Sequence, residues 1–135
     1  MSENPKKIIE TRTTIIFWED EPNAILTAEL KPKSVVTVKD LKEDMEVYKN
    51  NFQHPNRKTI VDSTNLYIIG KEARDFIASS EGTYAYFDAV ALLSNSKYSN
   101  NSLLAYVGLK AYPLKKPTKL FYKKQDAIDW LKNLK

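Results

Sequence analysis

The sequence contains no cysteine, a single histidine and only three glycines. Without cysteine there is no disulfide, no thiolate nucleophile and no cysteine-ligated metal. The one histidine, His54, precedes a predicted strand, on the side of the sheet away from the expected ligand crevice. The glycines form no phosphate-binding loop, and the acidic residues show no metal-ligand spacing. We therefore expect a non-enzymatic protein with no catalytic residue, no metal and no cofactor.

Long apolar runs are missing as well. No stretch approaches the roughly 18 apolar residues of a membrane-spanning helix, and the first ten residues, MSENPKKIIE, lack the apolar segment of a signal peptide. With 42% hydrophobic and 28% charged residues, the composition is that of a soluble globular protein. We expect a cytoplasmic protein with a flexible N-terminus at 1–12 and a single domain at 13–135.

Positive charge is concentrated toward the C-terminal end of the chain. The net charge is +4, and from residue 110 onward eight lysines face two aspartates. Lysine clusters attract phosphates, so this third of the chain predicts an alternative function: binding of an anionic small molecule, a lipid headgroup or, less readily, a nucleic acid. The same lysines also suit an ordinary solvated surface. The candidate anion patch comprises Lys115, Lys116, Lys119, Lys123 and Lys124.

The first half of the chain predicts a β-hairpin followed by a helix. β-branched and aromatic residues over 13–18 and 24–30 flank an acidic turn. Thr37 followed by Asp40 resembles a capping box, which marks a helix start. Apolar residues then recur every three or four positions, which predicts one buried helix face: Val38, Leu41, Met45, Tyr48 and Phe52.

Strands and helices alternate in the second half. The segment 66–69 is interpreted as a connection that crosses the sheet edge. One strand per helix after an opening hairpin gives the order β-β-α-β-α-β-α-β-α, which predicts an α/β fold: a mixed, mostly parallel central sheet flanked by helices. The predicted strands are 59–62, 88–93 and 118–122, and the predicted helices are 71–78, 99–107 and 124–134.

Short polar segments follow two of the predicted strands and form the candidate binding surface. In parallel sheets, ligands and partners meet the crevice at the carboxyl ends of the strands. Asp62 is the one carboxylate in a catalytic-looking position, but capping of the turn that follows explains it better. We predict that a partner or ligand binds around Asp62, Ser63, Gly70, Lys71, Arg74, Asn95 and Ser96.

Four runs of the sequence resemble a known family. They are KEARDFIASSE at 71–81, AVALL at 89–93, KPTKLF at 116–121 and DAIDWL at 126–131. In this order and spacing they resemble a set of small uncharacterised bacterial proteins described as STAS/SEC14-like, with a SpoIIAA-like fold. The resemblance covers most of the chain and implies this fold.

The resemblance also implies a class of function. The anti-sigma-factor antagonists that typify STAS domains carry an Asp-Ser-Ser-Gly signature, whose serine is phosphorylated by a partner kinase. The matching positions here are 70–73, Gly-Lys-Glu-Ala, which offer no hydroxyl. The resemblance therefore implies regulatory binding of an unknown protein partner without the usual phosphorylatable serine. SEC14-like lipid carriers have extra helices for which this chain has no length. Exposed strand edges, or Trp18 and Trp130, would support a weak homodimer.

Overall fold

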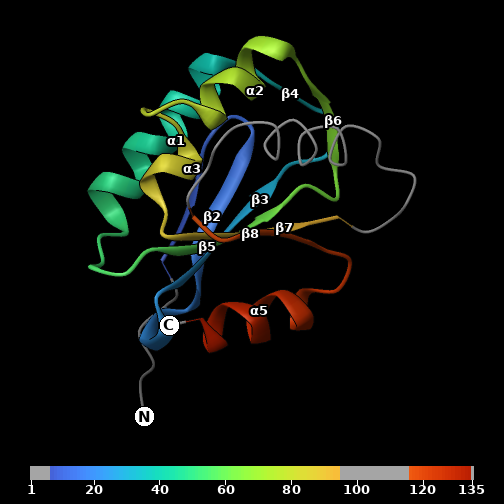
Figure 1. The fold of residues 1–135 in the computed structure, drawn as a ribbon. Helices are drawn as coiled ribbons and strands as arrows, with labels where there is room; N and C mark the ends of the chain where they lie inside the picture. The colour runs from blue at the N-terminus through green and yellow to red at the C-terminus, as the bar shows by residue number, and fades with distance from the viewer. Residues whose placement is uncertain (1–6, 95–115, 135) are drawn as a thin grey trace.

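The computed structural model describes residues 7–94 and 116–134 and shows a six-stranded mixed sheet with helices on both faces (Figure 1). The spatial order of the strands is β1-β2-β3-β5-β7-β8. This is the predicted α/β architecture. The strands are β1 (Ile8–Glu10), β2 (Thr14–Asp20), β3 (Ile25–Leu30), β5 (Lys58–Asp62), β7 (Ala89–Leu93) and β8 (Thr118–Phe121).

The sheet has an antiparallel part and a parallel part. Strands β1, β2 and β3 form an antiparallel meander, with the 3₁₀ helix η1 (Glu21–Asn23) between β2 and β3. Strands β3, β5, β7 and β8 are parallel. The predicted hairpin and mostly parallel centre are therefore confirmed. The predicted flexibility through residue 12 is wrong for Ile8–Glu10, because Ile9 lies opposite Ile16 and packs against the core.

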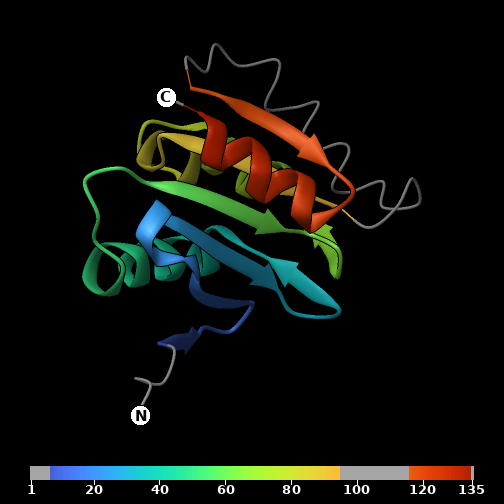
Figure 2. The ribbon, with the colours of Figure 1, turned by 90° about the horizontal axis from the view of Figure 1, so that it is seen from below.

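Helices α1 (Val38–Asn51), α2 (Lys71–Ala78) and α3 (Thr83–Tyr86) lie on one side of the sheet, and α5 (Lys124–Asn133) lies on the other (Figures 1 and 2). Helix α1 begins at the predicted capping box. The Thr37 hydroxyl accepts the Asp40 N–H, and the Asp40 carboxylate accepts the Thr37 N–H. Helix α3 was not predicted, because it is a single turn of four residues. The helix predicted at 99–107 lies outside the described residues.

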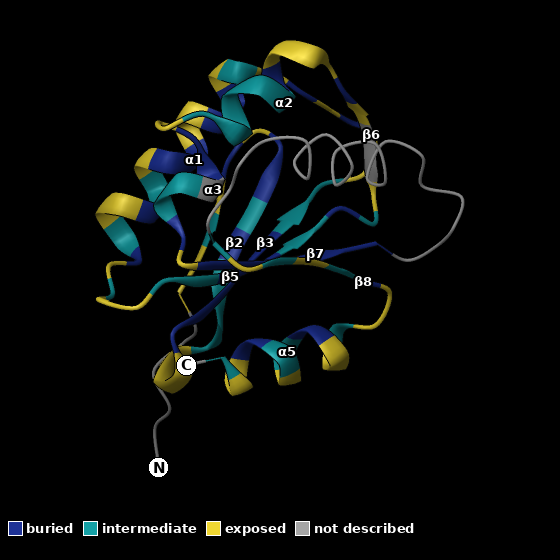
Figure 3. Ribbon diagram, in the orientation of Figure 1, coloured by how far each residue is buried: buried dark blue, intermediate teal, exposed yellow. Residues whose placement is uncertain are grey.

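The core has two layers, one on each side of the sheet. The α1 side packs sheet residues against the predicted apolar face of α1, where Leu41, Met45, Tyr48 and Phe52 are buried. The α5 side packs Ile25, Ile60 and Ala91 against Ala127 and Leu131. All five residues of β7 are buried, as expected for a strand covered on both faces (Figure 3).

A second, two-stranded parallel sheet lies beyond the carboxyl ends of β3 and β5. It consists of β4 (Ser34–Val36) and β6 (Leu66–Ile69), which we call the ribbon. The sequence predicted only a turn and a connection here, because strands of three or four residues carry little periodicity of their own. Val36 and Ile69 lie opposite each other and pack on Leu41 and Ala73. The ribbon therefore joins the start of α1 to the start of α2.

Candidate functional site

Asp62 and Ser63 lie at the carboxyl edge of the six-stranded sheet, where the sequence placed them, but both support the fold. Asp62 Oδ1 accepts a hydrogen bond from the Thr64 N–H at 3.0 Å, which caps the turn after β5. Ser63 is buried, and its N–H and its hydroxyl each donate to the Leu93 carbonyl at 2.8 Å. Ser63 thus fastens β5 to β7 and presents no hydroxyl at the surface.

The other predicted site residues belong to a different layer. Gly70 is the N-cap of α2, and Lys71 and Arg74 lie in its first turn, at the far end of the ribbon from Ser63 (Figure 1). The Lys71 ammonium forms an ion pair with Asp75 at 3.0 Å. Asn95 and Ser96 lie outside the described residues. The predicted residues therefore fall into two groups, one in the main sheet and one beside the ribbon.

The lysines of the candidate anion patch do not form one cluster. Lys116 donates to the Ala85 carbonyl on the α3 side of the sheet, whereas Lys124 pairs with Glu19 at 2.6 Å on the α5 side. Lys119 lies over the Phe121 ring, and Lys123 precedes α5. Lys115 lies outside the described residues. The basic composition of the C-terminal third thus does not produce a single basic surface in the described part of the chain.

The ribbon presents an exposed apolar pair that the sequence analysis missed. Val35 of β4 lies opposite Ile68 of β6, and each is 43% exposed. The backbone carbonyl of Val35 accepts a hydrogen bond from Arg12 at 2.8 Å. β-branched and aromatic residues in Ser34–Val36 and Leu66–Ile69 are a weak strand signal. Only the fold brings Val35 and Ile68 together, because they are 33 positions apart in the sequence.

A groove lies at the opposite, amino edge of the sheet, between the end of α1 and α3. Its volume is about 510 Å³. The Arg57 guanidinium lies 4.3 Å above the centre of the Tyr86 ring, and its Nε donates to the Tyr86 carbonyl at 2.8 Å. The His54 Nδ1 accepts the Asn56 N–H at 3.2 Å. The lining residues are Lys49, Gln53, His54, Pro55, Arg57 and Tyr86.

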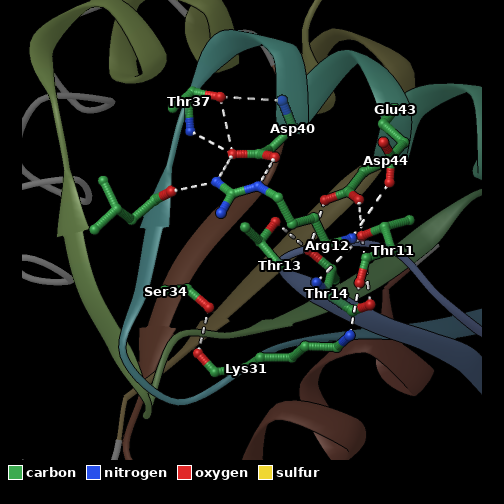
Figure 4. A network of polar contacts seen from close by, with 11 residues as sticks. Thr11, Arg12, Thr13, Thr14, Lys31, Ser34, Thr37, Asp40, Glu43 and Asp44 are labelled. Atoms are coloured by element: carbon green, nitrogen blue, oxygen red, sulfur yellow. Dashed lines mark hydrogen bonds and ion pairs between the residues drawn. The ribbon is translucent and has the colours of Figure 1, made fainter.

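A polar network joins the β1–β2 loop to α1 (Figure 4). The hydroxyls of Thr11 and Thr14 each donate to the Asp44 carboxylate at 2.6 Å. Burial raises the pKa of Asp44 to about 6, although the two hydroxyls act in the opposite direction. One turn earlier, Arg12 donates from Nε and Nη2 to the two oxygens of Asp40, which lowers the pKa of Asp40 to about 2.

Neither carboxylate is open to a substrate. Asp44 is sealed between β2 and α1, so a substrate has no route to it. Asp40 is occupied by Arg12 and the capping box. Among residues 7–94 and 116–134, no three His, Asp or Glu side chains are grouped to hold a metal ion. In the same residues, no helix has both the length and the apolar character that crossing a membrane requires.

A comparison with models of protein families shows to which family this chain belongs. Residues 17–135 match the model of DUF7793, a domain of unknown function. The chain belongs to the DUF7793 family. The match begins within β2 and includes the ribbon strands and every residue that lines the groove, so the ribbon and the groove are parts of the DUF7793 domain.

The DUF7793 chain also resembles a solved structure. An uncharacterised protein of the DUF3478 family from Shewanella loihica PV-4, with a SpoIIAA-like fold, superposes with a TM-score of 0.55 and 19% sequence identity. The alignment covers 97% of this chain and 98% of the other. At that identity the likeness concerns the fold alone, and it confirms the SpoIIAA-like fold predicted from the sequence. No curated protein matches the chain.

The groove, unlike the ribbon pair, had a partial signal in the sequence. Lys49, His54 and Arg57 fall within nine positions at the end of a predicted helix, which is a local concentration of side chains that donate hydrogen bonds from nitrogen. Tyr86 comes from a separate segment, 29 residues after Arg57. Only the pairing of β5 with β7 brings the two together, because it places Arg57 beside Asp88.

Proposed function

We propose that this DUF7793 protein is a non-enzymatic module that binds a partner protein through the ribbon. The observation that carries the proposal is the Val35–Ile68 pair, two large aliphatic side chains exposed side by side. Single exposed apolar residues are common, but an adjacent pair on two hydrogen-bonded strands provides a continuous apolar contact. The buried pair behind it, Val36 and Ile69, anchors the ribbon to the core.

The charges beside the pair indicate what the partner presents. Lys33, two positions before Val35, is exposed, and Lys71 and Arg74 begin the helix that follows Ile68. Glu72 and Asp75 lie on the same helix, so the balance of charge is only moderately positive. We expect a partner segment with an apolar side chain for the Val35–Ile68 pair and flanking carboxylates for these cations.

The resemblance to STAS domains supports a regulatory role for such binding. It does not support the usual phosphoserine switch. The matching positions offer no hydroxyl, since they are Gly70, Lys71, Glu72 and Ala73. The nearby Ser63 is buried, and its hydroxyl donates to the Leu93 carbonyl. Control would then depend on the amount or the state of the partner, rather than on phosphorylation of this loop.

Site-specific photocrosslinking in extract of the native cell tests the proposal. A photoreactive amino acid is placed at Ile68, and the crosslinked proteins are identified by mass spectrometry. We expect one predominant crosslinked protein. Its yield should fall when Val35→Ser is added, because the apolar contact area is roughly halved, and when Lys71→Ala/Arg74→Ala is added, because partner carboxylates lose their cations.

Ile8 provides the matched control. It is 57% exposed, on the edge strand β1 of the six-stranded sheet, which does not pair with either strand of the ribbon. A probe at Ile8 should not capture the same protein, and Ile8→Ser should leave the Ile68 crosslink unchanged. Equal capture from both positions, or a crosslink at Ile68 that Val35→Ser does not weaken, would show that the ribbon is not the binding surface.

A further inference from the structure

We infer that the groove at the amino edge of the sheet binds the phosphate group of a small organic phosphate. This site is distinct from the proposed partner surface, because it lies at the opposite ends of β5 and β7. Its lining combines an arginine, a lysine and a histidine with the ring of Tyr86. At about 510 Å³ the groove has the size of typical small-molecule sites.

Arg57 is fixed in a position from which it can bind an anion. Its backbone N–H donates to Asp88 at 2.8 Å, and its Nε donates to the Tyr86 carbonyl. Its guanidinium carbon lies over the Tyr86 ring, 4.3 Å from the ring centre. Tyr86 is itself stacked on buried Tyr48. Within residues 7–94 and 116–134, neither Nη group of Arg57 has a hydrogen-bond acceptor. The side chain is thus held by Nε and presents its two Nη groups for a bidentate contact.

His54 adds a second oriented donor. Its Nδ1 accepts the Asn56 N–H, so in the neutral ring the proton is on Nε2. The ring lies edge-on to Trp18, with the two ring centres 6.1 Å apart. The remaining ring nitrogen is therefore a donor in the neutral form as well as in the charged form.

Lys49 supplies the second full charge. It is exposed near the end of α1, where its charge also offsets the negative end of the helix dipole. Among residues 7–94 and 116–134, no carboxylate lies within ion-pair distance of its ammonium. The lining contains no carboxylate, and Asp88, which is next to Arg57, accepts the Arg57 N–H. Donors from three side chains suit the three terminal oxygens of a phosphate monoester better than the two oxygens of a carboxylate.

The test is a titration of ¹⁵N-labelled protein with inorganic phosphate and with ribose 5-phosphate, at constant ionic strength, followed by NMR. We expect saturable shifts confined to the amides of residues 49–57 and 86–88 and to the Trp18 indole. Lys49→Gln should weaken binding by about tenfold, because it removes one charge-assisted hydrogen bond. Lys39→Gln, on the exposed side of the same helix, removes the same charge and should leave the affinity unchanged.

Arg57→Lys distinguishes bidentate recognition from simple attraction. The substitution keeps the positive charge but removes the two parallel N–H donors of the guanidinium. We expect about a tenfold weaker affinity for phosphate. If this variant unfolds, the comparison of Lys49→Gln with Lys39→Gln still tests the site, because both lysines lie on the helix surface and their substitution should leave the fold intact. Equal effects of those two variants, or shifts spread over lysines throughout the molecule, would overturn the site. Stronger binding of a phosphoserine peptide than of ribose 5-phosphate would overturn its assignment to a small molecule.

Discussion

The Thr14 hydroxyl donates a hydrogen bond to Asp44 Oδ2 at 2.6 Å and so connects β2 to the helix that covers it. Thr11 makes the same bond to Oδ1. Two neutral donors only partly compensate a buried carboxylate for its lost hydration. The charge of Asp44 is therefore a cost to the folded state, and its magnitude depends on pH.

The contribution of Asp44 to the free energy of unfolding should fall as the pH rises from about 4 to 6. Because the pKa of Asp44 is raised to about 6, the folded state binds this proton more tightly than the unfolded state does. The difference amounts to at most about 3 kcal/mol. Urea unfolding of the wild type and of Asp44→Asn at pH 4.5 and 7 measures it. The wild type should lose more stability than the variant between these two pH values. Parallel pH profiles of the two proteins would contradict the assignment.

Arg12 and Asp40 should produce the opposite dependence at lower pH. Arg12 holds the pKa of Asp40 near 2, so the stability from this pair is present above about pH 4 and is lost as the pH falls toward 2. Arg12→Ala should lower the stability at neutral pH only modestly, because the arginine is largely exposed and its ion pair is screened by water. It should also flatten the stability profile below pH 4, measured by circular dichroism during urea unfolding. An unchanged acid profile would show that Arg12 does not control Asp40.

Gly82 should tolerate no side chain. A Cβ atom at this position would meet the carbonyl oxygen of Phe76 and would lie 2.6 Å from that of Ile77, because the turn passes closely over the end of α2. Gly82→Ala should therefore lose about 1–3 kcal/mol in thermal or urea unfolding. Gly70→Ala is the matched control, since a Cβ there has no neighbour within 4 Å. Its effect should stay within about 0.5 kcal/mol, because the entropy lost by the unfolded chain offsets the poorer N-cap. Equal effects of the two substitutions would contradict the close approach.

Ser63 should matter for stability but not for partner binding. Ser63→Ala removes the buried hydroxyl that donates to Leu93 and should cost about 1 kcal/mol. Thr64→Ala, at the adjacent and less buried position, should cost less than half of that. Urea unfolding measures both. A stable Ser63→Ala variant that loses the Ile68 crosslink would show instead that the hydroxyl belongs to the binding surface.

The elements that the sequence predicted are those whose signals are local. The Thr37–Asp40 capping box and the apolar run Ala89–Leu93 needed no knowledge of the rest of the chain. The ribbon and α3 were missed because three or four residues do not establish a periodicity. The predicted site residues do not lie together, because strand β6 of the ribbon comes between Ser63 and Lys71 and separates two groups that are close in the sequence.

The candidate sites depend on contacts between distant segments, and this is why the sequence did not predict them. Val35 and Ile68 become neighbours only through strand pairing. Arg57 meets Tyr86 only because β5 and β7 are adjacent. In contrast, the lysines after residue 110 are close in sequence, but Lys116 and Lys124 reach opposite sides of the sheet.

The order of strands in the sheet has a consequence for how the protein folds. The meander β1-β2-β3 closes short loops, whereas each parallel pair joins residues about 30 positions apart, such as Ile60 and Ala91. Closing those loops costs chain entropy before the contacts across the parallel strands repay it. The meander can therefore form early, and the docking of β7 and β8 should limit the rate of folding. Folding in milliseconds to seconds is expected for such a topology, and until it is complete the apolar edge of β5 stays open to other chains.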